Sequence, residues 1–196
     1  MRRNLSAWKT TAIICFLSVL LFHCSDEKQS RIHKYFEVGH FVDQQLAQLR
    51  LSNARLVKTM RFDDGIETQT LSGLDSNSWR KELRIFGEHD INKPVLLDAY
   101  SIDEQSQSNG GRIETYRLVD DGKNGVLDME IVYRANGEVA SWRSSFKEEN
   151  LLYSNFRDVS LITGDEGQLT GYNIEGYHKL LLKDTVRYHI AVVIEN

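Results

Sequence analysis

The chain lacks the cysteines that cross-link many small exported domains. It contains only two, Cys15 and Cys24, and both lie near the N-terminus. The rest of the sequence therefore offers no disulfide and no cysteine-based metal site. A domain built from it must be stabilised by its hydrophobic core alone, and we expect no cofactor.

A hydrophobic run long enough to cross a bilayer is also missing. The longest run, Ala12–Phe22, covers eleven residues, whereas a transmembrane helix needs about 20. It follows Arg2, Arg3 and Lys9, and no acidic residue occurs before Asp26. A basic segment followed by a short apolar run is typical of a secretory signal peptide. A permanent membrane span is the alternative, and the length of the run disfavours it.

The residues that end this run, Leu21-Phe22-His23-Cys24, resemble the lipobox of bacterial lipoproteins. The resemblance implies that the Cys24 thiol is acylated and that the chain is cut before it. Leu21 matches the favoured apolar position, whereas Phe22 and His23 replace the small residues that usually precede the cysteine. This departure bears on the efficiency of cleavage. Two or more acyl chains would anchor the protein stably, because a single chain binds a membrane only marginally.

These features divide the chain into a signal peptide (residues 1–23), a lipidated cysteine with an acidic tether (24–30) and a single domain (31–196). The tether is short and polar, which suits a solvated spacer between bilayer and domain. It resembles the acidic segment after the cysteine in surface-exported lipoproteins of Bacteroidota, and an ordinary linker is the alternative. We therefore expect a lipid-anchored protein of the cell envelope, at the outer membrane, on its periplasmic or its surface-exposed side.

The charge balance narrows the choice of partners. Removing the three basic residues of 1–23 leaves 21 of the 24, against 28 acidic residues, and a net charge of −7. Nucleic-acid binding requires a basic surface, so this class of partner is disfavoured. A polybasic attachment to anionic lipid is disfavoured for the same reason. The expected anchor is covalent lipid on Cys24.

Hydrophobic periodicity predicts helices first and strands later. Apolar residues recur at three- and four-residue steps over 35–51, which indicates an amphipathic helix. Alternating residues surround Asp64-Gly65, a dipeptide typical of hairpin turns. A second helix is expected to start within 75–78 and to end before Pro94, the only proline of the chain. Its apolar face would carry Trp79, Leu83 and Phe86.

After Pro94 the sequence reads as strands separated by turns. The expected strands are 95–102, 112–119, 126–134, 138–146, 151–163, 168–178 and 185–194, with a polar loop at 103–111. The expected fold class is α+β, with two amphipathic helices packed on a largely antiparallel meander sheet of about six to eight strands. The pattern does not decide whether this sheet is strongly curved, like half of a barrel.

Alternation within the strands predicts which side chains are buried. Leu127, Met129, Ile131 and Tyr133 are expected to share one face. The last strand alternates without a break from Val186 to Ile194, which places Ile190 among the most buried residues. Arg187 and His189 would then face the other way.

Several short segments together resemble a family of uncharacterised exported lipoproteins from Bacteroidota. Besides the lipobox region, they are Tyr35-Phe36-Glu37-Val38, Phe41-Val42-Asp43-Gln44-Gln45, Asp90-Ile91-Asn92-Lys93-Pro94, Leu151-Leu152-Tyr153 and Gly171-Tyr172-Asn173-Ile174-Glu175-Gly176. The resemblance covers most of the chain after Cys24. It consists of these short sequence motifs and the order in which they occur. It implies no activity.

The stretch Asp120–Asp128 has some residues of a calcium-binding loop. Gly122 and Ile131, however, occupy two positions where ligands are required. Asp and Gly are also common turn residues, so we expect a hairpin turn without a metal.

Recognisable catalytic patterns are absent. The sequence has no nucleophile elbow, phosphate-binding loop, dinucleotide fingerprint or Ser-x-x-Lys motif, and no histidine pair with zincin spacing. His178 and His189 lie on neighbouring expected strands. With Trp142 and Arg187 they are the candidates for a surface binding site on the sheet.

Three functions remain open. The favoured one is a non-enzymatic envelope lipoprotein that binds a protein, glycan or peptide on its sheet, and it expects exposed aromatic residues on one face. A lipid or apolar-ligand carrier expects a lined interior void. A hydrolase with an unrecognised site expects a cleft with clustered, pKa-perturbed side chains.

Overall fold

The computed structural model describes residues 34–63, 65–120 and 124–195. These described residues form one compact unit. Its helices are α2 (Val38–Leu49), α3 (Ser76–Gly87) and a short 3₁₀ turn, η1 (Pro94–Leu96). None of the helices in the described ranges is long and apolar enough to cross a membrane. The strands are β1 (Arg55–Phe62), β2 (Gly65–Leu71), β3 (Tyr100–Ser106), β4 (Arg112–Leu118), β5 (Gly125–Tyr133), β6 (Val139–Glu149), β7 (Tyr153–Thr163), β8 (Leu169–Leu180) and β9 (Val186–Glu195).

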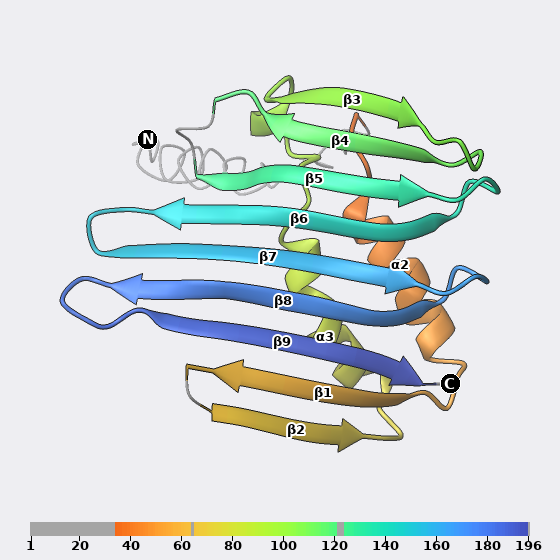
Figure 1. Cartoon of the computed structure of the whole chain (residues 1–196), viewed down its shortest axis with the longest axis horizontal. Coiled ribbons are helices and arrows are strands. Elements are labelled where there is room, and N and C mark those ends of the chain that lie inside the picture. The colour runs from red at the N-terminus through yellow and green to blue at the C-terminus, as the bar shows by residue number, and fades with distance from the viewer. Residues whose placement is uncertain (1–33, 64, 121–123, 196) are drawn as a thin grey trace, which may run out of the picture. The chain divides into compact units, whose positions relative to one another are not determined.

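All nine strands belong to one antiparallel sheet, in the order β2-β1-β9-β8-β7-β6-β5-β4-β3 (Figure 1). Strands β3 to β9 form a continuous meander, because each pairs with the next along the chain. The early hairpin β1–β2 pairs with the last strand, β9. The α+β class and the antiparallel sheet are as predicted. The strand number exceeds the prediction, and the sheet is open, with β2 and β3 at its edges.

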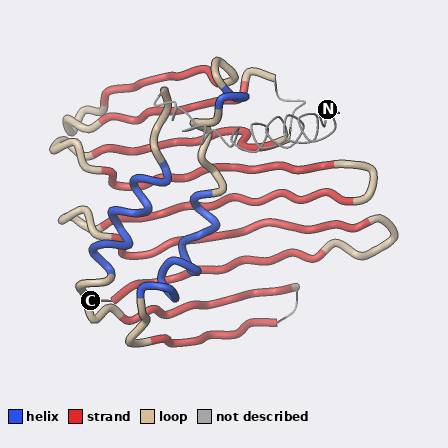
Figure 2. Tube along the Cα trace, turned by 180° about the vertical axis from the view of Figure 1, so that it is seen from behind, coloured by secondary structure: helices blue, strands red, loops and turns tan. Residues whose placement is uncertain are grey.

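Both helices cover the same face of the sheet (Figure 2). Helix α2 packs through the predicted stripe, since Val38, Phe41, Leu46 and Leu49 are all buried. Helix α3 begins as its sequence predicts, because the Asp75 carboxylate accepts a 2.8 Å hydrogen bond from the Ser78 backbone N–H. The three predicted core residues of α3, Trp79, Leu83 and Phe86, are buried.

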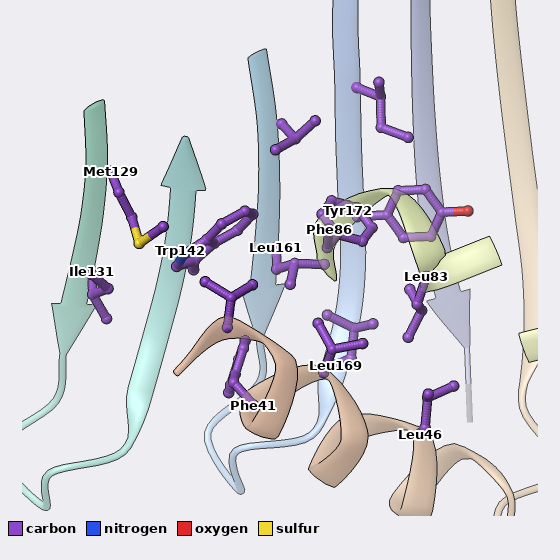
Figure 3. Packing of buried hydrophobic residues seen from close by; sticks show 14 of the residues in the cluster. Phe41, Leu46, Leu83, Phe86, Met129, Ile131, Trp142, Leu161, Leu169 and Tyr172 are labelled. Carbon is purple, nitrogen blue, oxygen red and sulfur yellow. The ribbon is translucent and has the colours of Figure 1, made fainter. Parts of the chain in front are cut away.

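The core lies between this helix pair and the sheet (Figure 3). The Phe86 ring makes edge-to-face contacts with Trp142 on β6 and Tyr172 on β8, at centroid distances of 6.0 and 5.3 Å. The Tyr172 hydroxyl donates a 2.6 Å hydrogen bond to Glu82 of α3. Aromatic packing and one partly buried polar contact thus hold α3 against the centre of the sheet.

The segment after Pro94 differs from its prediction. The expected strand 95–102 starts instead at Tyr100, after η1, and β3 continues to Ser106 through residues expected to form a loop. A loop was predicted there because the side chains from Asp103 onward are polar. β3 is an edge strand that pairs with β4 over its whole length, and an edge strand can expose polar side chains while its backbone bonds to one neighbour.

Two predicted core positions also need correction. A β-bulge between Val126 and Asp128 turns Val126 into the core, so Leu127 does not share the buried face of Met129. Ile190 is only partly buried, whereas Val192 and Ile194 on the same face are buried. The face of β9 is therefore apolar as predicted, but it is buried most deeply toward the C-terminal end of the strand.

Candidate functional site

The face of the sheet opposite the helices is not covered by any described segment (Figures 1 and 2). Strand register defines this open face, because residues directly opposite each other on paired strands point to the same side. Its central part is polar. The side chains that strands β4 to β8 place there include Arg117, Asp128, Glu130, Arg143, Ser145, Asp158, Ser160, Asn173 and Glu175.

These side chains line a hollow of about 620 Å³ on the open face. Its walls carry four carboxylates, two guanidinium groups, and hydroxyl and amide groups, together with a few apolar side chains such as Leu127. The bulge that turns Val126 into the core is also what leaves Leu127 on this side. The hollow can offer both hydrogen-bond donors and acceptors to a ligand.

Part of the polar lining is already paired within the protein. The Arg143 Nε lies 3.4 Å from the Glu130 Oε1, and the Ser145 hydroxyl donates a 3.2 Å hydrogen bond to the Asp128 Oδ1. By contrast, the side chains that β7 and β8 contribute have no hydrogen bond or ion pair with any described residue. These side chains are Asp158, Ser160, Asn173 and Glu175. Their polar atoms are free for a ligand.

Strands β7 and β8 present matched rows of side chains on the open face. Three cross-strand pairs follow one another, namely Phe156 with Tyr177, Asp158 with Glu175, and Ser160 with Asn173. The two rings of the first pair are stacked, with centroids 6.0 Å apart and an interplanar angle of 22°. Steps of two residues along a strand cover about 6.6 Å. An aromatic platform thus adjoins the unpaired acidic and polar groups of the hollow.

Only two of the four predicted surface residues lie at this site. On β9, Arg187 is in register with Tyr177, and His189 is in register with Glu175. Both border the open face beside β8. His178 was a possible cross-strand neighbour of His189, but it pairs with Val186 and points to the helix side of the sheet, where it stacks on Tyr153.

Trp142 is not a surface residue. Its exposed fraction is 0%, and it packs under α3 against Phe86. The prediction was wrong for a simple reason. Alternation shows that Trp142 shares a face of the sheet with other apolar residues, but it does not show which of the two faces the helices cover. The same alternation could have located the residues that it missed. Phe156 and Asp158 alternate with the core residues Val159 and Leu161, and therefore had to face away from them.

A second polar cluster lies inside the core. Arg157 donates from Nε to Nε2 of His89 over 3.1 Å, so the proton of a neutral His89 ring resides on Nδ1. The His89 Nδ1 can then donate to the Ser144 hydroxyl over 3.0 Å. The Ser144 hydroxyl in turn donates to the backbone carbonyl of Asp128 over 2.8 Å. Burial, with the charges of Arg157 and Lys93, lowers the pKa of His89 to about 3. Since His89 is fully buried, this cluster ties the segment that follows α3 to the sheet.

Metal ligation finds no support in the part of the chain that the structure describes, where no group of three or more His, Cys, Asp or Glu side chains could hold an ion. Residues 121–123 of the predicted turn lie outside the described ranges. The signal peptide, the lipobox with Cys24 and the tether lie outside them as well, so these remain predictions from the sequence.

The comparisons with known proteins identify no relative. No protein-family model matches the chain, no curated protein matches it, and no solved structure matches it. The function must therefore be inferred from the geometry of the site.

Proposed function

We propose that this protein is a membrane-anchored lipoprotein of the cell envelope, and that the open face of its sheet binds a glycan. The observation that carries the proposal is the stacked pair Phe156–Tyr177 beside the unpaired polar groups of Asp158, Asn173 and Glu175. An aromatic face attracts the C–H groups of a sugar ring. Carboxylate, amide and hydroxyl groups can then bond to the sugar hydroxyls.

The chemistry of the hollow favours a glycan over the other ligands. An apolar ligand would leave its many polar groups without partners, which is unfavourable. A carrier would also need an enclosed cavity, whereas this hollow lies on the outer face of an open sheet. A protein partner would favour a flatter surface with a more apolar centre.

Binding of soluble envelope polysaccharides by the purified protein tests the proposal. Phe156→Ala and Tyr177→Ala should each weaken binding at least about tenfold, because each removes half of the stacking platform. Phe62→Ala is the matched control, since Phe62 is an exposed aromatic residue on the helix side of the sheet. Equal affinities for all four proteins would exclude the open face as the binding site.

One observation favours a second function, that of a glycan hydrolase. Asp158 and Glu175 face each other directly across β7 and β8, and paired carboxylates are the catalytic groups of most glycosidases. Prolonged incubation with the bound polysaccharide distinguishes the two functions. New reducing ends that disappear in Asp158→Asn and Glu175→Gln would establish the hydrolase, and an intact polysaccharide would establish the binding module.

A further inference from the structure

Among the central strands β5 to β9, the hairpin tips at the two ends of the sheet differ in chemistry. The β5–β6 and β7–β8 connections, at the right of Figure 1, have polar tips with glycine in the left-handed region, Gly137 at φ 85° and Gly167 at φ 75°. These are ordinary residues for exposed turns. The β6–β7 and β8–β9 connections, at the left of Figure 1, have leucine tips instead.

The leucines of this end are almost completely exposed. Leu151 in the β6–β7 tip is 93% exposed, and Leu182 in the β8–β9 tip is 95% exposed. Leu182 also has a φ of 61°, a left-handed conformation that leucine disfavours. Leu152, Leu180 and Leu181 are exposed beside them, and the two tips line a common surface hollow of about 670 Å³. Neither solubility nor turn geometry explains leucine at these positions.

The exposed leucines of this end favour a lipid surface. They come from two separate loops around a common hollow, and a protein partner would need a surface shaped to fit both loops. A fluid bilayer needs none. Lys179 and Lys183 lie in the same hairpin, and neither ammonium group has an ion pair among the described residues. They can reach the phosphates of the headgroups while their aliphatic stems stay beside the leucines.

The chain between the proposed anchor and the first described residue limits how far the domain can lie from the bilayer. Nine residues separate Cys24 from Lys34, which pairs with Asp98 just before β3. The ten Cα–Cα steps from Cys24 to Lys34 would span at most about 33–36 Å when fully extended. A domain held on this tether stays near the bilayer, and its apolar end can turn toward it.

We propose that the β6–β7 and β8–β9 tips insert into the headgroup region of the membrane, with Leu151 and Leu182 as the deepest side chains. This docking surface goes beyond the proposed glycan binding, and it rests on the proposed anchor only for the nearness of the bilayer. It would orient the sheet with its strands directed toward the membrane. The open face would then stand upright and accessible from the side.

The test is depth-dependent fluorescence quenching on the full chain reconstituted in vesicles of phosphatidylethanolamine and phosphatidylglycerol. An NBD fluorophore is attached to Leu182→Cys or, as control, to Glu166→Cys in the β7–β8 tip at the other end of the sheet. The unsubstituted chain reports labelling of the native cysteines. We expect blue-shifted emission and at least about twofold stronger quenching by doxyl-labelled lipid at position 182 than at position 166.

Equal, water-like emission at both positions would overturn the proposal. Blue-shifted emission at position 182 without quenching by the labelled lipid would also overturn it, since the tips would then contact protein. A further comparison uses two exposed leucines of similar accessibility. Leu151→Ser should lower the quenching at position 182, whereas Leu51→Ser, 91% exposed after α2, should not. If the purified protein binds no glycan but the quenching at position 182 persists, the proposed ligand is refuted and the membrane docking stands.

Discussion

Asp158 on β7 lies directly opposite Glu175 on β8 on the open face of the sheet, and neither carboxylate has a protein partner among the described residues. Like charges directly opposite each other destabilise an antiparallel pair. Asp158→Asn should therefore raise the free energy of unfolding by about 0.2–1 kcal/mol, while weakening glycan binding. Urea denaturation and binding measurements on the same preparation check both effects. A less stable variant would show that the pair has a structural role.

Stability should depend on pH through His89. The pKa of His89 is lowered from 6.5 to about 3 in the folded protein, so between these values the unfolded chain binds one more proton. The free energy of unfolding should therefore fall as the pH falls from 6.5 toward 3, by up to about 1.4 kcal/mol per pH unit from this group.

The check is urea denaturation of the wild type and His89→Gln between pH 5 and 6.5, a window above the normal range of carboxylates. The variant should be less stable at neutral pH and should show a smaller slope. The same slope in both proteins would mean that His89 is protonated in the fold.

The two faces of β9 should respond differently to truncation. Ile194 is buried against the helices, so Ile194→Ala should lower the free energy of unfolding by about 2–5 kcal/mol. Ile190→Ala should cost less, because Ile190 is only partly buried. His189→Ala, on the open face, should change stability by under about 0.5 kcal/mol. If His189→Ala were as damaging as Ile194→Ala, the open face would be covered in solution.

Two turn residues should respond in opposite directions. Gly137 has a φ of 85° and free space around its Cα, so Gly137→Ala should destabilise by about 1–2 kcal/mol through backbone strain alone. Leu182 has a similar φ of 61°. Leu182→Gly should stabilise the protein by up to about 1 kcal/mol, because it relieves the same strain. Thermal unfolding of both variants measures the contrast, and a destabilised Leu182→Gly would show that Leu182 packs against the fold.

Local patterns predicted much of the fold. Helix α3 was predicted from its cap at Asp75 and its apolar positions, because capping and periodicity act within a few residues. Most strands from Arg112 onward were predicted for the same reason. The edge strand β3 was missed because its stability comes from pairing with β4, which lies elsewhere in the sequence. The bulge that exchanges Val126 for Leu127 in the core is likewise set by pairing with β6.

The candidate site was harder to predict, because it depends on which face the helices leave open. Arg187 and His189 were placed on the correct face by alternation alone. The rows of β7 and β8 become a site only through the register that sets Phe156 beside Tyr177. Trp142 was misplaced because nothing local to β6 indicates that α3 covers it.

The proposed place of the protein in the cell envelope depends on the anchor at Cys24, and metabolic labelling with a clickable fatty acid tests it most directly. The lipobox-like residues that precede Cys24 predict acylation of its thiol. The wild-type protein should incorporate the label and fractionate with membranes, whereas Cys24→Ser should remain unlabelled. Equal labelling of the two proteins, or no labelling of either, would contradict the account.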